Sequence, residues 1–233
     1  MKVMTFNTQH CLNYITQKID FDVMAQAIIS CDPDVVSLNE MRGAGEDPEY
    51  TEQVERLAEL TGMTYFYFAP AIYFSGKGPY GNGILSKIPI LSVKTVIIPD
   101  PVEKIYNSEY YETRCVLVAE LEGGVKVLIT HIGLNPDEKL NAVLTIVKNL
   151  SDEKCILMGD FNMRPDDKML TPIFERMTDA AEGFCSDKFS FPSDDPDRKI
   201  DYVFVSRDAK VISADIPAIT ASDHRPHTAC IEF

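Results

Sequence analysis

Apolar residues recur at helical spacing in the first part of the chain. Four of them fall three or four positions apart, which places them on one face of a helix: Met24, Ala27, Ile28 and Cys31. Pro33 lacks the backbone N–H that a longer helix would need, so the predicted helix ends before it. Such a face is typical of a helix that packs on a hydrophobic core.

The clearest helix signal lies near the middle of the chain and contains both members of a capping box. Asn135 can accept from free backbone N–H groups of the first turn, and Glu138 follows three residues later. The apolar residues after this cap share one face of the predicted helix: Leu140, Val143, Leu144 and Val147. Weaker patterns predict two more helices, over Thr51–Leu60 and Lys168–Met177.

Short apolar runs predict the strands. They cover Val3–Phe6, Val35–Leu38, Tyr65–Phe68, Gly83–Lys87, Leu91–Ile98, Cys115–Leu121, Val125–Thr130, Cys155–Met158, Asp201–Ser206, Lys210–Asp215 and His227–Phe233. Gly123 and Gly124 form a typical hairpin turn, so part of the pairing should be antiparallel. Many strands and few helices predict two packed sheets covered by helices. Because no linker or repeat is present, we expect one domain over residues 1–233.

Charge is the unusual feature of the composition. The chain carries 22 basic and 36 acidic side chains, which gives a formal net charge of −14. Negative charge spread over a surface repels nucleic-acid phosphates, which argues against a general binder of polyanions. The same charge is equally consistent with a role in solubility alone.

The six cysteines are scattered and never form a Cys-x-x-Cys pair, so neither a zinc finger nor a redox motif is indicated. Most lie in apolar runs, where a thiol behaves as a small hydrophobic group. Lys2–Phe6 has the pattern of a strand rather than of a signal peptide, and no apolar run reaches membrane-spanning length. We therefore expect free thiols and a cytoplasmic protein without a membrane span.

Candidate chemistry collects where predicted strands end or begin. Apolar runs give way abruptly to acids, amides or histidines at Asn7, Asn39-Glu40, His131, Asp160, Asn162, Asp201 and Asp223-His224. Taken singly, each is more typical of a turn or of a solvated histidine. Buried carboxylates are costly unless they are paired or bind a metal, so convergence of Glu40, Asp160, Asp201 and Asp223 would indicate a cation site.

A series of short segments, in this order, resembles the endonuclease/exonuclease/phosphatase superfamily. The segments are Thr5-Phe6-Asn7, Leu38-Asn39-Glu40, Gly83-Ile84-Leu85-Ser86, Thr130-His131, Gly159-Asp160-Phe161-Asn162, Ile200-Asp201-Tyr202-Val203-Phe204 and Ser222-Asp223-His224-Arg225-Pro226. The resemblance implies a four-layered α/β/β/α sandwich of two mostly antiparallel mixed sheets, with the site at one rim. It also implies a divalent ion, Mg²⁺ or Mn²⁺. Asn39 stands where glutamine is common in the family, and the lysine-rich insertion of DNA-cleaving members is missing.

The metal ligands that we expect are hard oxygen donors, which suit Mg²⁺. Glu40 is the first candidate, and Asp223 and Asn7 would complete or orient the shell. By resemblance, His224 is the general base or an electrostatic partner of the phosphate, and Asp201 holds it in one tautomer.

The remaining candidates surround the reacting phosphate. Asp160 and Asn162 would position the attacking water or the phosphoryl group. His131 would hydrogen-bond a non-bridging oxygen or protonate the leaving oxygen. Two residues are expected to bind substrate: Asn82 through its amide and Arg114 through a bidentate phosphate contact, although a turn residue and a surface ion pair are equally consistent with them.

Other residues have less specific expectations. Tyr106, Tyr110 and Tyr111 are expected to wall a cleft, and His10 and His227 are expected to be bystanders. A ring of basic residues is expected around the site: Lys77, Lys87, Arg114, Arg164, Arg198, Lys199 and Arg225.

Three functions are compatible with these residues. The first is a magnesium-dependent hydrolase, phosphodiesterase or phosphatase, which acts on a small phosphorylated substrate through in-line attack of an activated water. The second is an endonuclease or exonuclease, for which a continuous basic face would be expected. The third is a non-catalytic binding module, which is disfavoured because Glu40, Asp160, Asp201 and His224 are all present.

Overall fold

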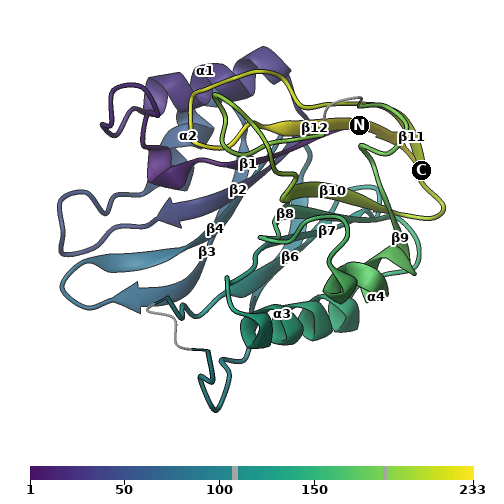
Figure 1. Cartoon of the computed structure of the whole chain (residues 1–233). Coiled ribbons are helices and arrows are strands. Elements are labelled where there is room, and N and C mark those ends of the chain that lie inside the picture. Colours follow the sequence, from purple (N-terminus) through teal and green to yellow (C-terminus); the bar gives the residue numbers. More distant parts are fainter. Residues whose placement is uncertain (107–109, 186–187) are drawn as a thin grey trace.

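A computed structural model describes residues 1–106, 110–185 and 188–233 (Figure 1). The strands are β1 (Lys2–Asn7), β2 (Val35–Arg42), β3 (Tyr65–Phe74), β4 (Gly78–Ser86), β5 (Ile90–Ile97), β6 (Cys115–Leu121), β7 (Lys126–His131), β8 (Cys155–Asp160), β9 (Met177–Asp179), β10 (Asp201–Ser206), β11 (Lys210–Asp215) and β12 (His227–Glu232). The helices are α1 (Phe21–Cys31), α2 (Gln53–Thr61), α3 (Pro136–Asn149) and α4 (Thr171–Phe174), with short 3-10 turns η1 (Gln9–Cys11) and η2 (Lys168–Leu170).

The strands form two six-stranded sheets that pack face to face. The first has the order β11-β12-β1-β2-β4-β3 and the second β5-β6-β7-β8-β10-β9. In each sheet two central neighbours are parallel, β1 with β2 and β7 with β8, and the other neighbours are antiparallel. Helices α1 and α2 cover the outer face of the first sheet, and α3 and α4 cover that of the second (Figure 1). The predicted four-layered sandwich is therefore confirmed.

The central strands are buried on both faces, which explains their continuous apolar runs. Successive side chains alternate between the core that separates the sheets and an outer core under the helices. In β1, Val3 points between the sheets, whereas Met4 packs under α1 and α2. In β8, Ile156 points between the sheets and Leu157 packs under α3.

The two long predicted helices form, but one of them is rotated. In α1 all four residues of the predicted face are buried. In α3 the capping box is present, yet Leu140 and Leu144 are 53% and 61% exposed. The predicted Val143 and Val147 do pack on the core, together with Ala142 and Ile146, which the predicted face did not include. The error arose because small Ala142 contributes little to an apolar stripe although it lies at its centre.

The helix predicted over Lys168–Met177 is wrong. The chain makes η2, the four-residue helix α4 and then β9, which pairs with β10. Pro172 has no N–H to bond to a carbonyl one turn earlier, so a regular helix cannot run through it. The hairpin of β3 and β4 is longer than predicted because β3 is an edge strand, where Pro70 is tolerated.

All six cysteines are free thiols, as expected. No helix in the parts of the chain that the structure describes is long and apolar enough to cross a membrane.

Two buried amides join the sheets at one edge. Asn39 of β2 donates from Nδ2 to the Thr130 carbonyl oxygen of β7 at 2.9 Å and to Asn82 Oδ1 at 2.8 Å. Its Oδ1 accepts from the Asp160 backbone N at 3.1 Å. Asn82 of β4 in turn donates to the Cys115 carbonyl oxygen of β6 at 3.2 Å. These bonds fix the ends of β2 and β8 relative to each other.

We predict that Asn39→Leu lowers the free energy of unfolding by about 3 kcal/mol or more, because it leaves several buried groups without partners. Asn149→Leu is the matched control, since the Asn149 side chain donates to the Thr145 carbonyl within the same helix, α3. Urea unfolding followed by circular dichroism measures both. A loss under about 1 kcal/mol for Asn39→Leu would show that the sheets do not depend on this amide.

Candidate active site

The polar strand ends meet at one edge of the two sheets. Asn7 and Asn39 are register partners in the parallel pair β1–β2, and His131 and Asp160 are partners in β7–β8. Asp201 begins the antiparallel strand β10 and lies opposite Asp160. Because the ends of parallel strands share an edge with the start of an antiparallel neighbour, these side chains converge.

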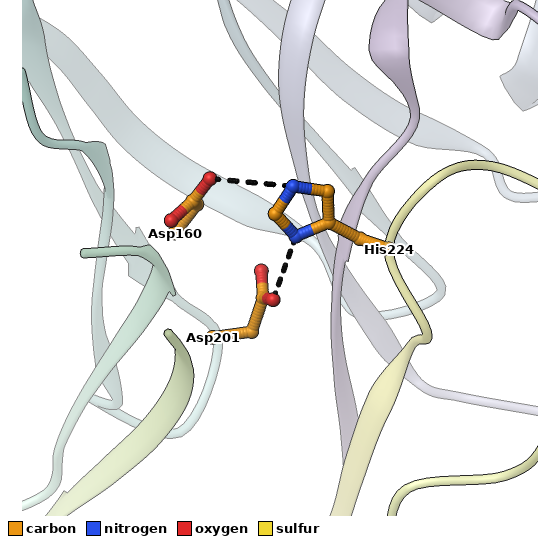
Figure 2. Close-up of side chains that lie close together, drawn as sticks. All are labelled: Asp160, Asp201 and His224. Carbon is orange, nitrogen blue, oxygen red and sulfur yellow. Dashed lines mark hydrogen bonds and ion pairs between the residues drawn. The ribbon is translucent and has the colours of Figure 1, made fainter. Parts of the chain in front are cut away.

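His224 lies between two aspartates at this edge (Figure 2). Its Nδ1 is 2.8 Å from Asp201 Oδ2, and its Nε2 is 3.7 Å from Asp160 Oδ2. The Ser190 hydroxyl donates to the same Asp201 oxygen at 2.6 Å, so the carboxylate is held in place. The Phe191 ring packs on the imidazole with 4.7 Å between centroids. All three side chains of the His–Asp–Asp group are buried.

The charges of this group are strongly coupled. Burial alone would lower the pKa of His224, but Asp201 and Asp160 outweigh it and raise the pKa to about 10. For Asp160, burial is the largest cause, and it raises the pKa to about 7 although the charge of His224 lowers it. Nδ1 is hydrogen-bonded to Asp201 and Nε2 lies at ion-pair distance from Asp160, so the two carboxylates favour the positively charged form of His224 at this edge.

His131 is neutral, and its tautomer follows from its partner. Arg114 Nη1 lies 3.0 Å from His131 Nδ1, and because arginine only donates, Nδ1 must accept. The ring proton is therefore on Nε2, which is 3.4 Å from Asp160 Oδ2. Burial, followed by the charge of Arg114, holds the pKa of His131 well below its ordinary value. Thus His131 faces the site as a hydrogen-bond donor.

Asn162 is held by a tight local turn. Its backbone N donates to Asp160 Oδ1 at 2.9 Å, and its Nδ2 donates to the Ile132 carbonyl at 2.9 Å. Its φ of 51° is in the left-handed region, which asparagine tolerates better than most residues. Nδ2 also lies 3.2 Å from His131 Nε2. Because the ring proton of His131 is on Nε2, both nitrogens of this contact are donors, and the contact is not a hydrogen bond.

Asn7 connects two carboxylates across the sheets. Its Nδ2 donates to Glu40 Oε1 and to Asp160 Oδ2, both at 3.1 Å. Its Oδ1 accepts from the Gln9 backbone N at 3.1 Å, which fixes the orientation of the amide that holds Glu40. Glu40 lies at an irregularity in β2 and has a φ of 65°. Burial, helped by the charge of Asp223, raises the pKa of Glu40.

The residues fit a divalent cation. Glu40 and Asp223 are hard oxygen donors, and Asp223 accepts from its neighbour Ser222 Oγ at 3.0 Å. Asp160, Asp201 and His224 also present ligand atoms within 4.8 Å of one another. In that group the Nδ1 atom of His224 is already engaged by Asp201 at 2.8 Å, whereas Glu40 and Asp223 offer only the oxygen donors that Mg²⁺ prefers. The oxygen site at Glu40 is therefore the better fit.

The two expected substrate-binding residues are more enclosed than the sequence suggested. Asn82 is buried and uses its amide to join the sheets. Arg114 has Nη1 on His131 and Nη2 on Glu112 Oε2 at 2.6 Å, so a bidentate phosphate contact would require it to leave a partner. Its buried Nε has no hydrogen-bond partner in the described parts of the chain.

Lys199 does not belong to the expected basic ring. It is only 2% exposed, and its Nζ lies 3.2 Å from Asp179 Oδ2 and 4.2 Å from the centre of the Tyr202 ring. It lies two residues before the buried strand β10, and its charge is used inside the protein. Of the other ring members, Arg225 donates from Nε to the Ser193 carbonyl at 2.7 Å.

His10 lies closer to the site than expected of a bystander. Its Nδ1 is 3.9 Å from Glu40 Oε2, and burial followed by the charge of Arg42 lowers its pKa to about 4. Gln9, His10 and Cys11 have φ values of 47°, 49° and 65°, and no glycine or asparagine in this segment marks the left-handed turn in the sequence. His227 is fully buried on β12, opposite Thr5.

Comparisons with known proteins agree with this arrangement. A model of the endonuclease/exonuclease/phosphatase family matches residues 4–224. A comparison with curated protein sequences found no match. A solved endonuclease/exonuclease/phosphatase from Beutenbergia cavernae is similar, with 22% identity and a TM-score of 0.80 over 100% of this chain and 71% of that one.

Two other solved structures are similar over nearly their full length. A mannosyl-6-phosphatase from Bacteroides thetaiotaomicron has 16% identity and a TM-score of 0.77 over 100% of both chains. A humanized TDP2 from D. rerio has 15% identity and a TM-score of 0.70 over 100% of this chain and 99% of that one. At these identities the similarity shows the fold. Because the family model itself spans all the motifs at this sheet edge, the chain belongs to the endonuclease/exonuclease/phosphatase family, whose members hydrolyse phosphoesters.

Proposed function

We propose that this protein is a magnesium-dependent hydrolase of a small phosphorylated substrate. The observation that carries the proposal is the buried His224 held between Asp201 and Asp160, next to the Glu40–Asn7 pair. This places a positive charge, a proton acceptor and a hard oxygen ligand at one edge, which are the groups that phosphoryl transfer needs.

Each residue has a separate part in this proposal. Glu40 and Asp223 would hold Mg²⁺, which supplies positive charge to the phosphoryl oxygens. Asp201 fixes the imidazole of His224, so Nε2–H points toward the reacting phosphate and stabilises its negative charge. Asp160 positions the attacking water and accepts its proton. The backbone N–H of Asn162 holds Asp160 in place by donating to Asp160 Oδ1.

His131 acts on the other side of Asp160. Its Nε2–H donates to a phosphoryl oxygen or to the leaving oxygen, and Arg114 fixes the tautomer that makes this possible. Asn7 and Asn82 are positioning residues, because their amides orient Glu40 and Asn39. The free thiols support a reducing compartment, and we propose the cytoplasm.

The charge of the chain supports a small substrate over a nucleic acid. At −14 the surface opposes a long polyanion, whereas one phosphate needs only the local cation and His224. One of the similar structures is named a mannosyl-6-phosphatase, and that name agrees with a small phosphorylated substrate. Burial of Lys199 removes one charge that a nuclease could have used on the surface.

We expect Asp201→Asn to lower kcat about 100- to 10,000-fold. The neutral amide that replaces the carboxylate would neither hold the imidazole of His224 in its orientation nor favour its positive charge. The matched control is Asp166→Asn, which removes an exposed carboxylate. Steady-state hydrolysis of p-nitrophenyl phosphate and bis-p-nitrophenyl phosphate with Mg²⁺ measures the effect, with thermal unfolding to verify the fold. Equal rates for Asp201→Asn and Asp166→Asn would show that the His224–Asp201 pair has no part in the mechanism.

Glu40→Gln should leave the fold intact and abolish most metal-dependent turnover, because a neutral amide is a weaker ligand for a hard cation. The exposed Glu153→Gln is the control and should bind Mg²⁺ like the unmodified protein. Calorimetric titration with Mg²⁺ and activity at limiting Mg²⁺ give two independent readouts. If Glu40→Gln keeps full activity at limiting Mg²⁺, Glu40 is not a ligand.

Direct competition separates the small-substrate proposal from a nuclease. With equal enzyme, Mg²⁺ and moderate salt, we expect turnover of small phosphoesters and little nicking of plasmid DNA, because the acidic surface repels the longer polyanion. Product phosphate and gel electrophoresis measure the two reactions. Efficient nicking at nanomolar enzyme, with small esters nearly untouched, would establish the nuclease alternative.

A further inference from the structure

The Asp201 carboxylate is fully buried and is held through one of its two oxygens. Oδ2 accepts from the Ser190 hydroxyl at 2.6 Å and lies 2.8 Å from His224 Nδ1. Oδ1 is also buried, and within residues 1–106, 110–185 and 188–233 it has no hydrogen-bond partner. A buried carboxylate is costly without donors, so the Ser190 hydroxyl supplies a large part of what stabilises this charge.

Two donors on one oxygen fix the direction of the carboxylate. The last torsion of an aspartate side chain is broad, so a single hydrogen bond would let the carboxylate and the imidazole turn together. Ser190 lies in a different segment from His224 and approaches the same oxygen independently. The hydroxyl therefore sets where Asp201 holds Nδ1. Because the ring is rigid, it also sets where Nε2 lies relative to Asp160 Oδ2, which is 3.7 Å away.

The imidazole is restrained by the residue next to Ser190. The Phe191 ring packs on His224 with 4.7 Å between centroids and 50° between the ring planes. This contact limits tilting of the imidazole, whereas rotation within its own plane is limited by the hydrogen bond to Asp201. Movement of the carboxylate would therefore be passed on directly to Nε2.

The backbone of Ser190 is placed without the help of its side chain. Its N donates to the Arg198 carbonyl at 2.8 Å, and its carbonyl accepts from the Arg225 N at 2.7 Å. In the same segment Ser193 N donates to the Asp223 carbonyl at 2.7 Å, so the segment is bonded on both sides. The hydroxyl is thus in place before a substrate arrives, and its removal alone should leave the loop as it is.

A serine beside a histidine and an aspartate could also be a nucleophile. In a catalytic triad the serine hydroxyl is hydrogen-bonded to the histidine nitrogen that faces away from the aspartate. Here the Ser190 hydroxyl donates to the aspartate itself, and Ser190 is fully buried. The imidazole is not placed to take the hydroxyl proton, and a substrate cannot reach the oxygen. The geometry therefore argues against a nucleophile and favours a positioning role.

We propose that Ser190 is a positioning residue of the reaction, whose hydroxyl holds the Asp201 carboxylate in the direction that aims His224 Nε2 at the reacting phosphate; the proposal rests on the proposed function. In this role Ser190 forms no covalent bond and transfers no proton. It keeps its hydrogen bond to Asp201 and acts on the phosphate only through the Asp201–His224 pair. Ser190 lies outside the short sequence segments that resemble the family, so only the folded chain brings it to Asp201.

The first test compares Ser190→Ala with a matched control, Ser206→Ala, at saturating Mg²⁺. Ser206 is also fully buried and donates at 2.6 Å to an aspartate, Asp208, but it lies at the other end of β10. We expect Ser190→Ala to lower kcat for p-nitrophenyl phosphate or bis-p-nitrophenyl phosphate about 10- to 100-fold with KM nearly unchanged, because the aim of His224 matters most in the transition state. Ser206→Ala should keep the kcat of the unmodified protein.

A double variant shows whether Ser190 acts through Asp201. In the Asp201→Asn background the carboxylate that Ser190 holds is already gone, so adding Ser190→Ala should lower kcat by less than about twofold more. If the two losses multiply instead, Ser190 affects the reaction by another route, and the proposal is overturned.

Proton NMR of the metal-free protein reports the same geometry without any turnover. A ring N–H that is held by a carboxylate resonates far downfield, and the His224 signal is identified by its loss in His224→Gln. The unmodified protein and Ser206→Ala should show this signal, whereas Ser190→Ala should shift it upfield or broaden it through exchange with water. An unchanged signal in Ser190→Ala would show that the hydroxyl does not orient the pair, which also overturns the proposal.

Ser190→Cys takes the place of Ser190→Ala if the alanine variant does not fold. The thiol is close in size to the hydroxyl group but is a weak donor, so the same loss of kcat and the same change in the NMR signal are expected. A kcat within about twofold of the unmodified protein would overturn the positioning role and leave the phosphoesterase intact. If the unmodified protein hydrolyses no phosphoester with Mg²⁺ or Mn²⁺, the proposed function itself fails, and the role of Ser190 in the reaction fails with it.

Discussion

The buried amide of Asn39 is the interaction on which the geometry of the site depends. Both sheets contribute candidate residues, Asn7 and Glu40 from the first and His131, Asp160 and Asp201 from the second. Apolar packing between sheets is not directional and would allow them to slide. The bonds from Asn39 to the Thr130 carbonyl and the Asp160 N–H define one relative position, and Asn82 repeats the link to β6.

A second constraint is the concentration of negative charge next to this link. Glu40 and Asp160 both accept from the amide of Asn7, and burial raises the pKa of each carboxyl group. His224 compensates the Asp160–Asp201 side, where its imidazolium lies between the carboxylates. The Glu40 side has no equivalent cation in direct hydrogen-bond contact among the described residues, which is why a bound divalent ion fits there.

The sequence predicted those parts of the site that depend on strand ends. Asn7, His131, Asp160 and Asp201 end or begin strands that are buried on both faces, so an abrupt polar residue after an apolar run was informative. Residues that reach the site through turns were harder to identify. His10 lies beside Glu40 because of a left-handed turn, and Lys199 is buried because Asp179, at the end of an unpredicted strand, lies opposite it. Neither contact has a local pattern, since each depends on which elements the fold places together.

The backbone at Glu40 has a consequence for how this protein could change. A φ of 65° is unfavourable for glutamate by about 1–2 kcal/mol, and glycine would adopt it without this cost. Replacement of Glu40 by glycine would remove the carboxylate, and it would therefore relieve both the backbone strain and the cost of burying a charged group. A lineage released from selection on the proposed activity would meet no barrier from folding at this position, and it would lose the proposed metal ligand before it lost the sandwich.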